Sequence, residues 1–312
     1  MSDNNFWNKI KKPILALAPM AGFSDSPFRQ ITSGYGADVV YSEMASVTAL
    51  FYNKKTTLEL LKFNKRKEKN YVVQLFGSNP EHFAVATQIV TKEIRPNGID
   101  INFGCPVGKV IKQGAGSDLM TNLEKAHAVS KAVCDNTDLP VSVKIRAKSG
   151  EIGALDFLKS IADLPVAAVM IHGRTVRQGF VGEIDYNLIK EARKYFKGII
   201  LANGGINDLA GALKTLELTG ADGLGLARGV LGRPWMFKEI KQGREINLNI
   251  KVVAKIILRH AKKFKKIKGE PAMVDLRKHL CWYVQGIPNA SHYRSKMVAV
   301  SNYQDVKNIF KD

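Results

Sequence analysis

Residues 98–106 read GIDINFGCP, a short apolar run that stops at a sharp turn. Gly98 to Asn102 has the length and apolar content of a strand that is buried on both faces. Gly104 and Pro106 then favour a turn. We therefore expect Cys105 on a loop at the C-terminal end of a strand, where its thiol can meet a substrate. A lone cysteine is commonly a small buried hydrophobe instead, so the ends of the other strands decide between the two interpretations.

Seven further runs resemble this strand, and helix-like segments separate them along the first 240 residues. The helix-like segments are Pro80–Ile94, Leu123–Cys134, Leu155–Leu164, Tyr186–Phe196 and Leu209–Leu218. The predicted strands are Ile14–Ala18, Asp38–Tyr41, Tyr71–Leu75, Gly98–Asn102, Val141–Ile145, Ala167–Ile171, Ile199–Ala202 and Asp222–Leu226. Eight such units predict an α/β protein of the TIM (β/α)8 barrel class.

A doubly wound sheet is the rival architecture for an alternating pattern of this kind. Its nucleotide-binding form places a GxGxxG fingerprint after the first strand. Here the first strand is followed by Pro19-Met20-Ala21-Gly22, without that fingerprint. The barrel is therefore the favoured fold.

The pattern changes after about residue 245, where three helix-like pieces follow one another: Ile250–Lys268, Met273–Tyr283 and Tyr293–Ala299. The first has an apolar side, and lysines crowd the rest of it. We therefore expect a catalytic barrel over residues 1–245, followed by a small C-terminal helical domain over residues 246–312.

The net charge of +19 is concentrated in this C-terminal part. Residues 251–312 hold 14 basic and 4 acidic side chains, a balance of +10, whereas the first 250 residues have a balance of +9. A basic surface of this kind draws a protein toward polyanions such as nucleic acid. The alternative is that the charge serves only solubility.

Cysteine usage and hydropathy indicate the cellular setting. The three cysteines form no CxxC pair, which argues against a disulfide framework and a structural zinc site and suits a reducing compartment. Three lysines precede the apolar run at Ile14, as in a signal peptide, but Pro19 interrupts that run. No stretch reaches the roughly 18 apolar residues of a membrane span. We expect a cytoplasmic protein without a membrane partner or a metal, acting as a monomer.

Nearly every predicted strand ends in polar or ionisable residues, and in a TIM barrel these ends form the active site. They are Pro19-Met20, Glu43, Gln74, Asn102 with Cys105, Lys144 with Arg146, His172 with Arg174, Asn203-Gly204-Gly205 and Ala227-Arg228. Packing alone does not explain so many polar groups on one rim, which favours the catalytic interpretation of Cys105.

The last two strand ends have the composition of a phosphate site. Glycines let backbone N–H groups approach an anion, and we expect a helix near Asn207 whose N-terminus favours negative charge. Arg228 adds a charge-assisted contact. A phosphorylated cofactor is the favoured ligand, a phosphorylated substrate is the alternative, and a third interpretation is that the glycines only make tight turns.

Three further side chains suit a flavin. Lys144 inside the barrel mouth can stabilise the negative charge that a reduced flavin carries near N1. Gln74 can donate and accept, as the pyrimidine edge of a flavin requires. His172 at a strand end favours a ligand contact. The alternatives are a salt bridge from Lys144 to a carboxylate on a neighbouring strand, and a core position for His172.

Together these segments resemble the tRNA-dihydrouridine synthase family, and most closely its bacterial DusB type. The resemblance covers nearly the whole chain, with Asn102-Phe-Gly-Cys-Pro106 as its most specific motif. The other matching segments are Ala18–Arg29, Val73–Gly77, Val143–Arg146, His172–Thr175, Ala202–Ile206 and Lys278–Tyr283 with Arg294. Four positions depart from the family pattern: Phe103 for Met, Phe180 for Tyr, Gly205 for Asp and Ala227 for Gly.

The resemblance implies an FMN enzyme, reduced by NADPH, that reduces the C5=C6 bond of uridines in tRNA. Hydride passes from flavin N5 to C6, and the Cys105 thiol protonates C5. Asn102 and Arg174 would contact the target nucleotide or the flavin edge. The basic tail, with Lys262, Lys263, Lys265, Lys266 and Arg294, would hold tRNA. The expected FMN-binding residues are Pro19, Met20, Ala21, Gln74, Lys144, His172, Asn203, Gly204, Gly205, Ala227 and Arg228.

Two alternatives remain at this point. A flavin barrel of the dihydroorotate dehydrogenase type runs similar C5–C6 chemistry on a small molecule, but it does not explain the basic tail. A nucleic-acid-binding protein that has lost catalysis is the other.

Overall fold

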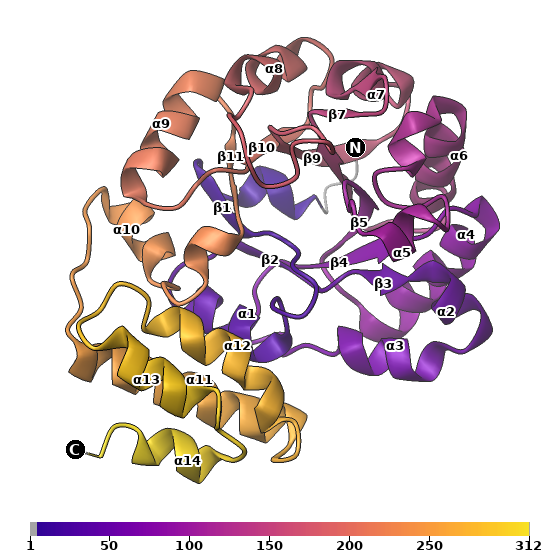
Figure 1. The fold of residues 1–312 in the computed structure, drawn as a ribbon. Coiled ribbons are helices and arrows are strands. Elements are labelled where there is room, and N and C mark those ends of the chain that lie inside the picture. The colour runs from indigo at the N-terminus through magenta and orange to yellow at the C-terminus, as the bar shows by residue number, and fades with distance from the viewer. Residues whose placement is uncertain (1–4, 312) are drawn as a thin grey trace.

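Eight parallel strands close into a barrel in the computed structural model, which describes residues 5–311 (Figure 1). Around the barrel the order is β2-β1-β11-β10-β9-β6-β5-β4, and β2 pairs with β4 to close it. The strands are β1 Ile14–Leu17, β2 Val39–Tyr41, β4 Tyr71–Phe76, β5 Gly98–Phe103, β6 Val141–Arg146, β9 Val166–His172, β10 Ile199–Asn203 and β11 Gly223–Leu226. All eight predicted runs lie on these strands, so the prediction of a TIM barrel is confirmed.

Side chains at alternate positions of each strand belong to two apolar cores, one inside the barrel and one between the barrel and its helices. On β1, Ala16 packs inside the barrel with Tyr41 and Met170, whereas Leu15 and Leu17 pack outward against the helices. This burial on both faces is why the strands read as continuous apolar runs. On β11, Gly225 leaves room for the Met170 side chain, since a Cβ there would lie 2.6 Å from its sulfur.

Helices cover the outside of the barrel, and short segments extend its upper rim. The helices are α1 Ser26–Gly34, α2 Val47–Tyr52, α3 Lys54–Leu61, α4 Pro80–Ile89, α5 Gly108–Ile111, α6 Leu123–Cys134, α7 Ala154–Ser160, α8 Tyr186–Glu191, α9 Leu209–Thr219 and α10 Met236–Gln242. Strand β3, Ala45–Ser46, pairs with β4, and β7, Lys148–Ser149, forms an antiparallel hairpin with β8, Ile152–Gly153. The sequence did not predict these three short strands.

Three predicted helices are shorter or less regular than their patterns indicated. The segment Pro80–Ile94 is α-helical only to Ile89 and then forms a π-helical turn, ending at Arg95 in the left-handed conformation. The helix predicted to reach Leu164 ends at Ser160. The helix predicted to reach Phe196 changes at Ala192 to a 3-10 turn.

The C-terminal helices pack on one side of the barrel, at the lower left of Figure 1. They are α11 Ile250–Lys268, α12 Met273–Tyr283, α13 Ala290–Met297 and α14 Tyr303–Asn308. The first two have the predicted bounds, the third begins three residues earlier than predicted, and α14 was not predicted. Their apolar faces form a separate core around Ile257 and Leu280. The boundary at residue 245 stays a prediction, and residues 1–4 and 312 of the two predicted domains lie outside the described residues.

The helical domain contacts the barrel through backbone as well as side chains. Gly232 has φ +71°, and a Cβ there would lie 2.1 Å from the carbonyl oxygen of Trp282 on α12. Asp25 on the barrel side and His260 and His279 of the helical domain form a buried cluster, in which one carboxylate oxygen and one nitrogen of each imidazole lie within 4.8 Å of one another. His260 Nδ1 lies 3.0 Å from the Tyr283 hydroxyl, and neither His260 Nε2 nor His279 Nε2 has a hydrogen-bond partner among residues 5–311.

Burial governs the protonation of this buried cluster. It lowers the pKa of His260 to about 3 and that of His279 well below its usual range, and it raises the pKa of Asp25 to about 6. Both imidazoles are therefore neutral at neutral pH.

No helix among residues 5–311 combines the length and the apolar composition that crossing a membrane requires.

Candidate active site

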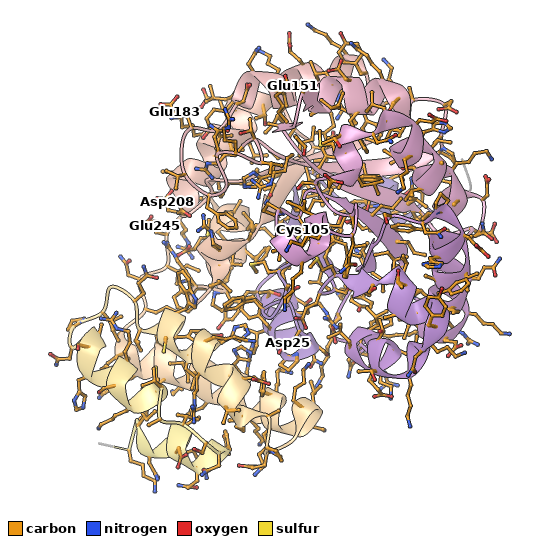
Figure 2. All side chains as sticks on the ribbon, turned by 45° about the vertical axis from the view of Figure 1, so that its right-hand side comes forward. Asp25, Cys105, Glu151, Glu183, Asp208 and Glu245 are labelled. Atoms are coloured by element: carbon orange, nitrogen blue, oxygen red, sulfur yellow. The ribbon has the colours of Figure 1, made fainter. Side chains whose placement is uncertain are left out.

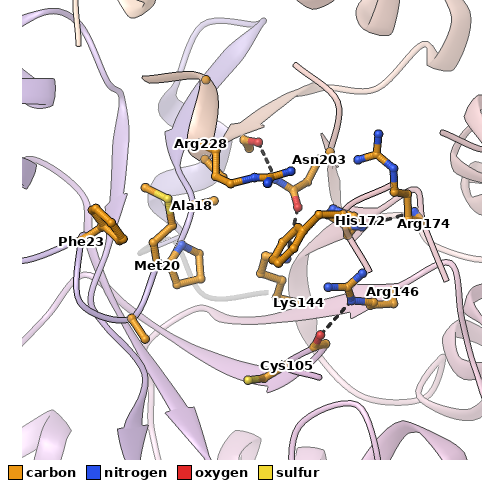
Figure 3. Close-up of a pocket in the computed structure, with 18 of the residues that line it drawn as sticks. Ala18, Met20, Phe23, Cys105, Lys144, Arg146, His172, Arg174, Asn203 and Arg228 are labelled. Atoms are coloured by element: carbon orange, nitrogen blue, oxygen red, sulfur yellow. Dashed lines mark hydrogen bonds between the residues drawn. The ribbon is translucent and has the colours of Figure 1, made fainter. Parts of the chain in front are cut away.

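A cavity of about 370 Å³ opens at the C-terminal ends of the barrel strands (Figure 3). Its walls include every barrel residue that was expected to catalyse or to bind a ligand, from the β1 loop round to the loop after β11. These are Pro19, Met20, Ala21, Gln74, Asn102, Cys105, Lys144, His172, Arg174, Asn203, Gly204, Gly205, Ala227 and Arg228. Glu43, which was also expected at this rim, does not line the cavity. The strand ends meet at one rim because the strands are parallel.

A chain of buried hydrogen bonds runs through the mouth of the barrel to the cysteine loop. Gln74 Nε2 donates to Asp100 Oδ2 at 2.7 Å, and Gln74 Oε1 accepts from Asn102 Nδ2 at 2.9 Å. The Oδ1 atom of Asn102 in turn accepts from the backbone N–H of Gly104 at 3.0 Å and of Cys105 at 2.9 Å. Asn102 therefore holds the turn that carries Cys105, and Gln74 keeps one N–H and one lone pair for a ligand.

Asp100 at the base of this chain was not among the predicted site residues. It accepts a 2.6 Å hydrogen bond from the Ser142 hydroxyl, and burial raises the pKa of its carboxyl group to about 6. The signal for it was present in the sequence, since an aspartate inside the apolar run Gly98–Asn102 needs buried partners.

Arg146 fastens the cysteine loop to the neighbouring loop after β9. Its Nε atom donates to the carbonyl oxygen of Gly104 at 3.0 Å, and its NH1 group donates to Thr175 at 3.3 Å and Gly179 at 2.8 Å. Behind the thiol, Gly116 has φ +63°, and a Cβ there would lie 2.7 Å from the Cys105 carbonyl oxygen. Cys105 itself is half-buried, so its loop is held while its sulfur faces the cavity (Figure 3).

Lys144 projects into the cavity without a carboxylate partner. Its Nζ atom donates to Asn203 Oδ1 at 3.2 Å, and Asn203 Nδ2 donates to the Gly225 carbonyl at 2.6 Å. Burial, followed by repulsion from Arg146, lowers the pKa of Lys144 to about 8. Among the described residues 5–311 Lys144 forms no ion pair, and its hydrogen-bond acceptor is an amide, so the alternative of a salt bridge to a neighbouring strand is wrong.

His172 lies beside Lys144 and is neutral at neutral pH. Burial, Lys144 and Arg146 lower its pKa to about 3. The backbone N–H of Arg174 donates to His172 Nδ1 at 3.3 Å, so the proton of the neutral ring is on Nε2. Gly204 lies against this nitrogen, since a Cβ there would come within 3.0 Å of it.

The loops after β10 and β11 form a cradle of backbone groups. Gly204 and Gly205 have φ +102° and +71°, which other residues rarely adopt. The helix predicted over Leu209–Leu218 begins at Leu209, two residues after Asn207, and the Asp208 side chain caps it. The cap uses one of the free N–H groups of the helix, that of Gly211. The anion-binding groups of the cradle are the loop N–H groups and Arg228.

Phe180 covers this cradle from the loop after β9. Its ring lies 4.2 Å from the guanidinium of Arg228 and 5.8 Å from that of Arg146, and the side chain is 57% exposed. Arg174 steadies the same loop, because its Nε atom donates to the Gly182 carbonyl at 2.7 Å. The loop thus holds the Phe180 ring against the guanidinium groups of Arg146 and Arg228 at the cavity.

The helical domain contributes to the cavity a residue that was not predicted for the site. This residue is Trp282 on α12, whereas the five basic residues of the tail, which were expected to hold tRNA, lie outside the cavity lining. Lys263 donates to Gln30 on α1 at 3.1 Å, and Lys265 pairs with Glu270 at 2.5 Å. The Lys278–Tyr283 motif could have signalled the role of Trp282, since a tryptophan beside a strongly basic helix is a candidate for stacking on a base.

The barrel, the cradle and the strand-end cysteine define a TIM-barrel protein whose candidate active site places a glycine-rich cradle beside a thiol. Solved structures share this fold: histamine dehydrogenase from Rhizobium sp. 4-9 has a TM-score of 0.58 at 13% identity, covering 81% of this chain and 49% of that one. The old yellow enzyme homologue from Zymomonas mobilis has a TM-score of 0.56 at 11% identity, covering 79% and 95%.

Sequence comparison identifies the family of this chain, which the shared fold alone does not. The family described as Dihydrouridine synthase (Dus) matches residues 16–312. A probable tRNA-dihydrouridine synthase of Aquifex aeolicus is 30% identical over 301 residues, covering 95% of each chain. The tRNA-dihydrouridine synthase B of Pasteurella multocida is 32% identical over 295 residues, covering 92% of this chain and 88% of its own. The chain belongs to the dihydrouridine synthase family.

Proposed function

We propose that this protein is an FMN-dependent synthase that reduces the C5=C6 bond of uridines in tRNA, with NADPH as reductant. The observation that carries the proposal is one cavity in which the Cys105 thiol, the Lys144 ammonium and the glycine cradle lie together. Membership of the dihydrouridine synthase family supports the reaction. The small number of cysteines, without a CxxC pair, supports a cytoplasmic location.

The residues of the cavity fit FMN. The cradle at Gly204, Gly205 and Arg228 would bind its phosphate through backbone N–H groups and one guanidinium. Lys144 would lie beside the isoalloxazine ring, where its charge stabilises the reduced, anionic form. Gln74 would use its remaining N–H and lone pair on the pyrimidine edge. When bound and reduced, FMN supplies a hydride for C6 of the uracil ring.

Cys105 would act as the general acid. Hydride addition at C6 leaves an electron pair at C5, conjugated with the C4 carbonyl, and the thiol proton is then transferred to C5. The products are 5,6-dihydrouracil and a thiolate, which regains a proton from solvent. The loop held by Asn102 and Arg146 fixes the thiol for this transfer. Positioned proton transfer of this kind contributes about 100-fold to 10,000-fold in rate.

The uridine would reach the flavin only after leaving its stack, as in other enzymes that act on bases. Trp282 and Phe180 offer aromatic faces at the edge of the cavity, and Arg174 and Asn102 offer donors for the uracil edge. The basic helical domain beside the cavity would bind the phosphate backbone.

The test follows reoxidation of the NADPH-reduced protein in the absence of oxygen, with and without unmodified tRNA. Wild-type flavin should be reoxidised only when tRNA is added, and dihydrouridine should form. The Cys105→Ala variant should keep its flavin spectrum and its reduction by NADPH, while uridine reduction slows by about 100-fold or more. Cys134→Ala is the matched control, because that thiol lies outside the cavity on α6.

Three results would count against the proposal. Full activity of Cys105→Ala on tRNA would remove the cysteine from its role as the acid. Flavin that reoxidises equally without tRNA would indicate a small-molecule oxidoreductase of the dihydroorotate dehydrogenase type. A protein that binds no flavin would refute the assignment of the cradle.

A further inference from the structure

A second hollow of about 220 Å³ lies where the barrel meets the helical domain, outside the cavity described above. Its walls come from α1, from the segment between α3 and β4, and from the C-terminal half of α11. The lining includes Ser26, Gln30, Lys62, Lys67, Lys263 and Lys266. Its volume is several times the ~30 Å³ that one water occupies in the liquid, so a phosphodiester group fits within it.

Four of the lining residues are lysines, two from each predicted domain. Lys263 donates to Gln30 Oε1 at 3.1 Å, a hydrogen bond that joins α11 to α1. Burial, and repulsion from Lys67, Arg259 and Lys266, lower the pKa of Lys263. The Lys263 charge is thus held beside other cations at a cost that a bound anion would remove.

The buried acidic group near the hollow, Glu68, already has partners within the barrel. Glu68 forms a buried ion pair with Arg29 at 2.6 Å and accepts a 2.6 Å hydrogen bond from the Ser26 hydroxyl. Lys62 pairs with Glu59 at 2.6 Å, but both side chains are more than 60% exposed, and such pairs exchange at little cost. Within residues 5–311, neither Lys67 nor Lys266 forms an ion pair, so the hollow keeps a net positive charge.

The hollow and the candidate active site are lined by residues that lie close together in the sequence. Phe23 lines the flavin cavity, and Ser26, three residues later, lines the hollow; three residues span at most about 11 Å. In the view of Figure 2, Asp25 lies between Cys105 and the helical domain. A nucleic acid whose base enters the cavity can therefore place a neighbouring phosphate at this junction.

We propose that this hollow binds a backbone phosphate of the RNA substrate, held jointly by Lys67 from the barrel and Lys263 from α11. The inference rests on the proposed function for the identity of the RNA. The proposal also assigns different roles to Lys263 and Lys265, two lysines that the sequence analysis had grouped together as tRNA-binding residues. Lys265 pairs with Glu270 and packs over Tyr303 on the side of α14, so it takes no part in this contact.

The test measures tRNA affinity against salt concentration for the holoenzyme and its variants. Each phosphate contact contributes about 0.7–0.9 to the slope of log affinity against log salt. The Lys67→Ala/Lys263→Ala variant should lose about one unit of slope and about tenfold in affinity at physiological salt. Lys265→Ala is the matched control and should keep the wild-type slope, and Lys67→Arg/Lys263→Arg should retain most of the affinity.

Further measurements separate the possible failures. A wild-type slope and affinity in the double alanine variant would overturn the proposal. Slower reduction of the flavin by NADPH in that variant, with unchanged tRNA binding, would also overturn it, because the hollow would then take the phosphate of the nicotinamide nucleotide. Reduced slope in a protein that forms no dihydrouridine would leave the hollow as an RNA site and refute only the proposed function.

Discussion

Replacing Lys144 by methionine should stabilise the FMN-free protein while impairing its use of FMN. Burial lowers the pKa of Lys144 from 10.5 to about 8, and each unit corresponds to about 1.4 kcal/mol. A charged lysine in the cavity therefore costs the native state about 3 kcal/mol at pH 7. The variant loses the 3.2 Å hydrogen bond to Asn203, worth about 1 kcal/mol. We expect a net gain of about 2 kcal/mol.

The pH dependence of this gain follows from the direction of the shift. Between pH 8 and 10.5 the unfolded chain keeps a proton that the native Lys144 has lost, so wild-type stability rises with pH in that window. Above pH 10.5 the lysine is neutral in both states and its charge no longer costs anything. The advantage of Lys144→Met should therefore shrink from about 2 kcal/mol at pH 7 to about zero near pH 10, and above pH 10.5 the lost hydrogen bond to Asn203 should leave the variant the less stable protein.

The assay is urea unfolding of FMN-free wild type and variant at pH 7, 8.5 and 10, alongside FMN titration at pH 7. Lys148→Met is a suitable control because that lysine is 45% exposed and pairs only with Glu151. The variant should bind FMN about tenfold more weakly. A variant that is less stable than wild type at pH 7, or a difference that does not change up to pH 10, would refute the reasoning.

Three further perturbations test other parts of the structure. Gly116→Ala places a Cβ 2.7 Å from the Cys105 carbonyl oxygen, so single-turnover uridine reduction should fall about 100-fold while reduction by NADPH is unchanged; equal loss of both would contradict this. Glu68→Ala leaves Arg29 buried without its carboxylate and should cost about 3–5 kcal/mol in urea unfolding, whereas a cost below about 1 kcal/mol would contradict it. Because burial lowers the pKa of His260 to about 3, the unfolded chain gains a proton as pH falls below about 6.5; His260→Gln should lose less stability than wild type between pH 7 and 5, and parallel losses would show another cause.

The barrel could be predicted because its strands are buried on both faces. Runs such as Ala167–Ile171 have no polar face, and only a few folds bury strands in this way. The helices Ile250–Lys268 and Met273–Tyr283 were predicted to the residue, since Asn249 caps the first and Gly269 ends it. The β7–β8 hairpin has strands of two residues, too short to show any period.

The candidate site was predictable where strand ends carry it and not where tertiary contacts do. Cys105 is the second residue after β5, and Lys144 lies near the C-terminal end of β6, so topology alone brings them to one cavity. Trp282 lies some 180 residues beyond Cys105 in the sequence, and its position depends on how α12 packs against the barrel. The separation of Lys263 from Lys265 likewise depends on neighbours from other segments, which a charge count along one helix does not reveal.

Gly232 bears on how members of this family can be recombined in the laboratory. Because a Cβ there would strike the backbone of Trp282 at 2.1 Å, the barrel meets α12 through main chain, and no side-chain substitution can compensate for a misfit. A chimera joined at residue 245 would pair the Gly232 loop with a foreign α12. A transplanted C-terminal domain should therefore carry its own loop after β11, so the crossover belongs before residue 227.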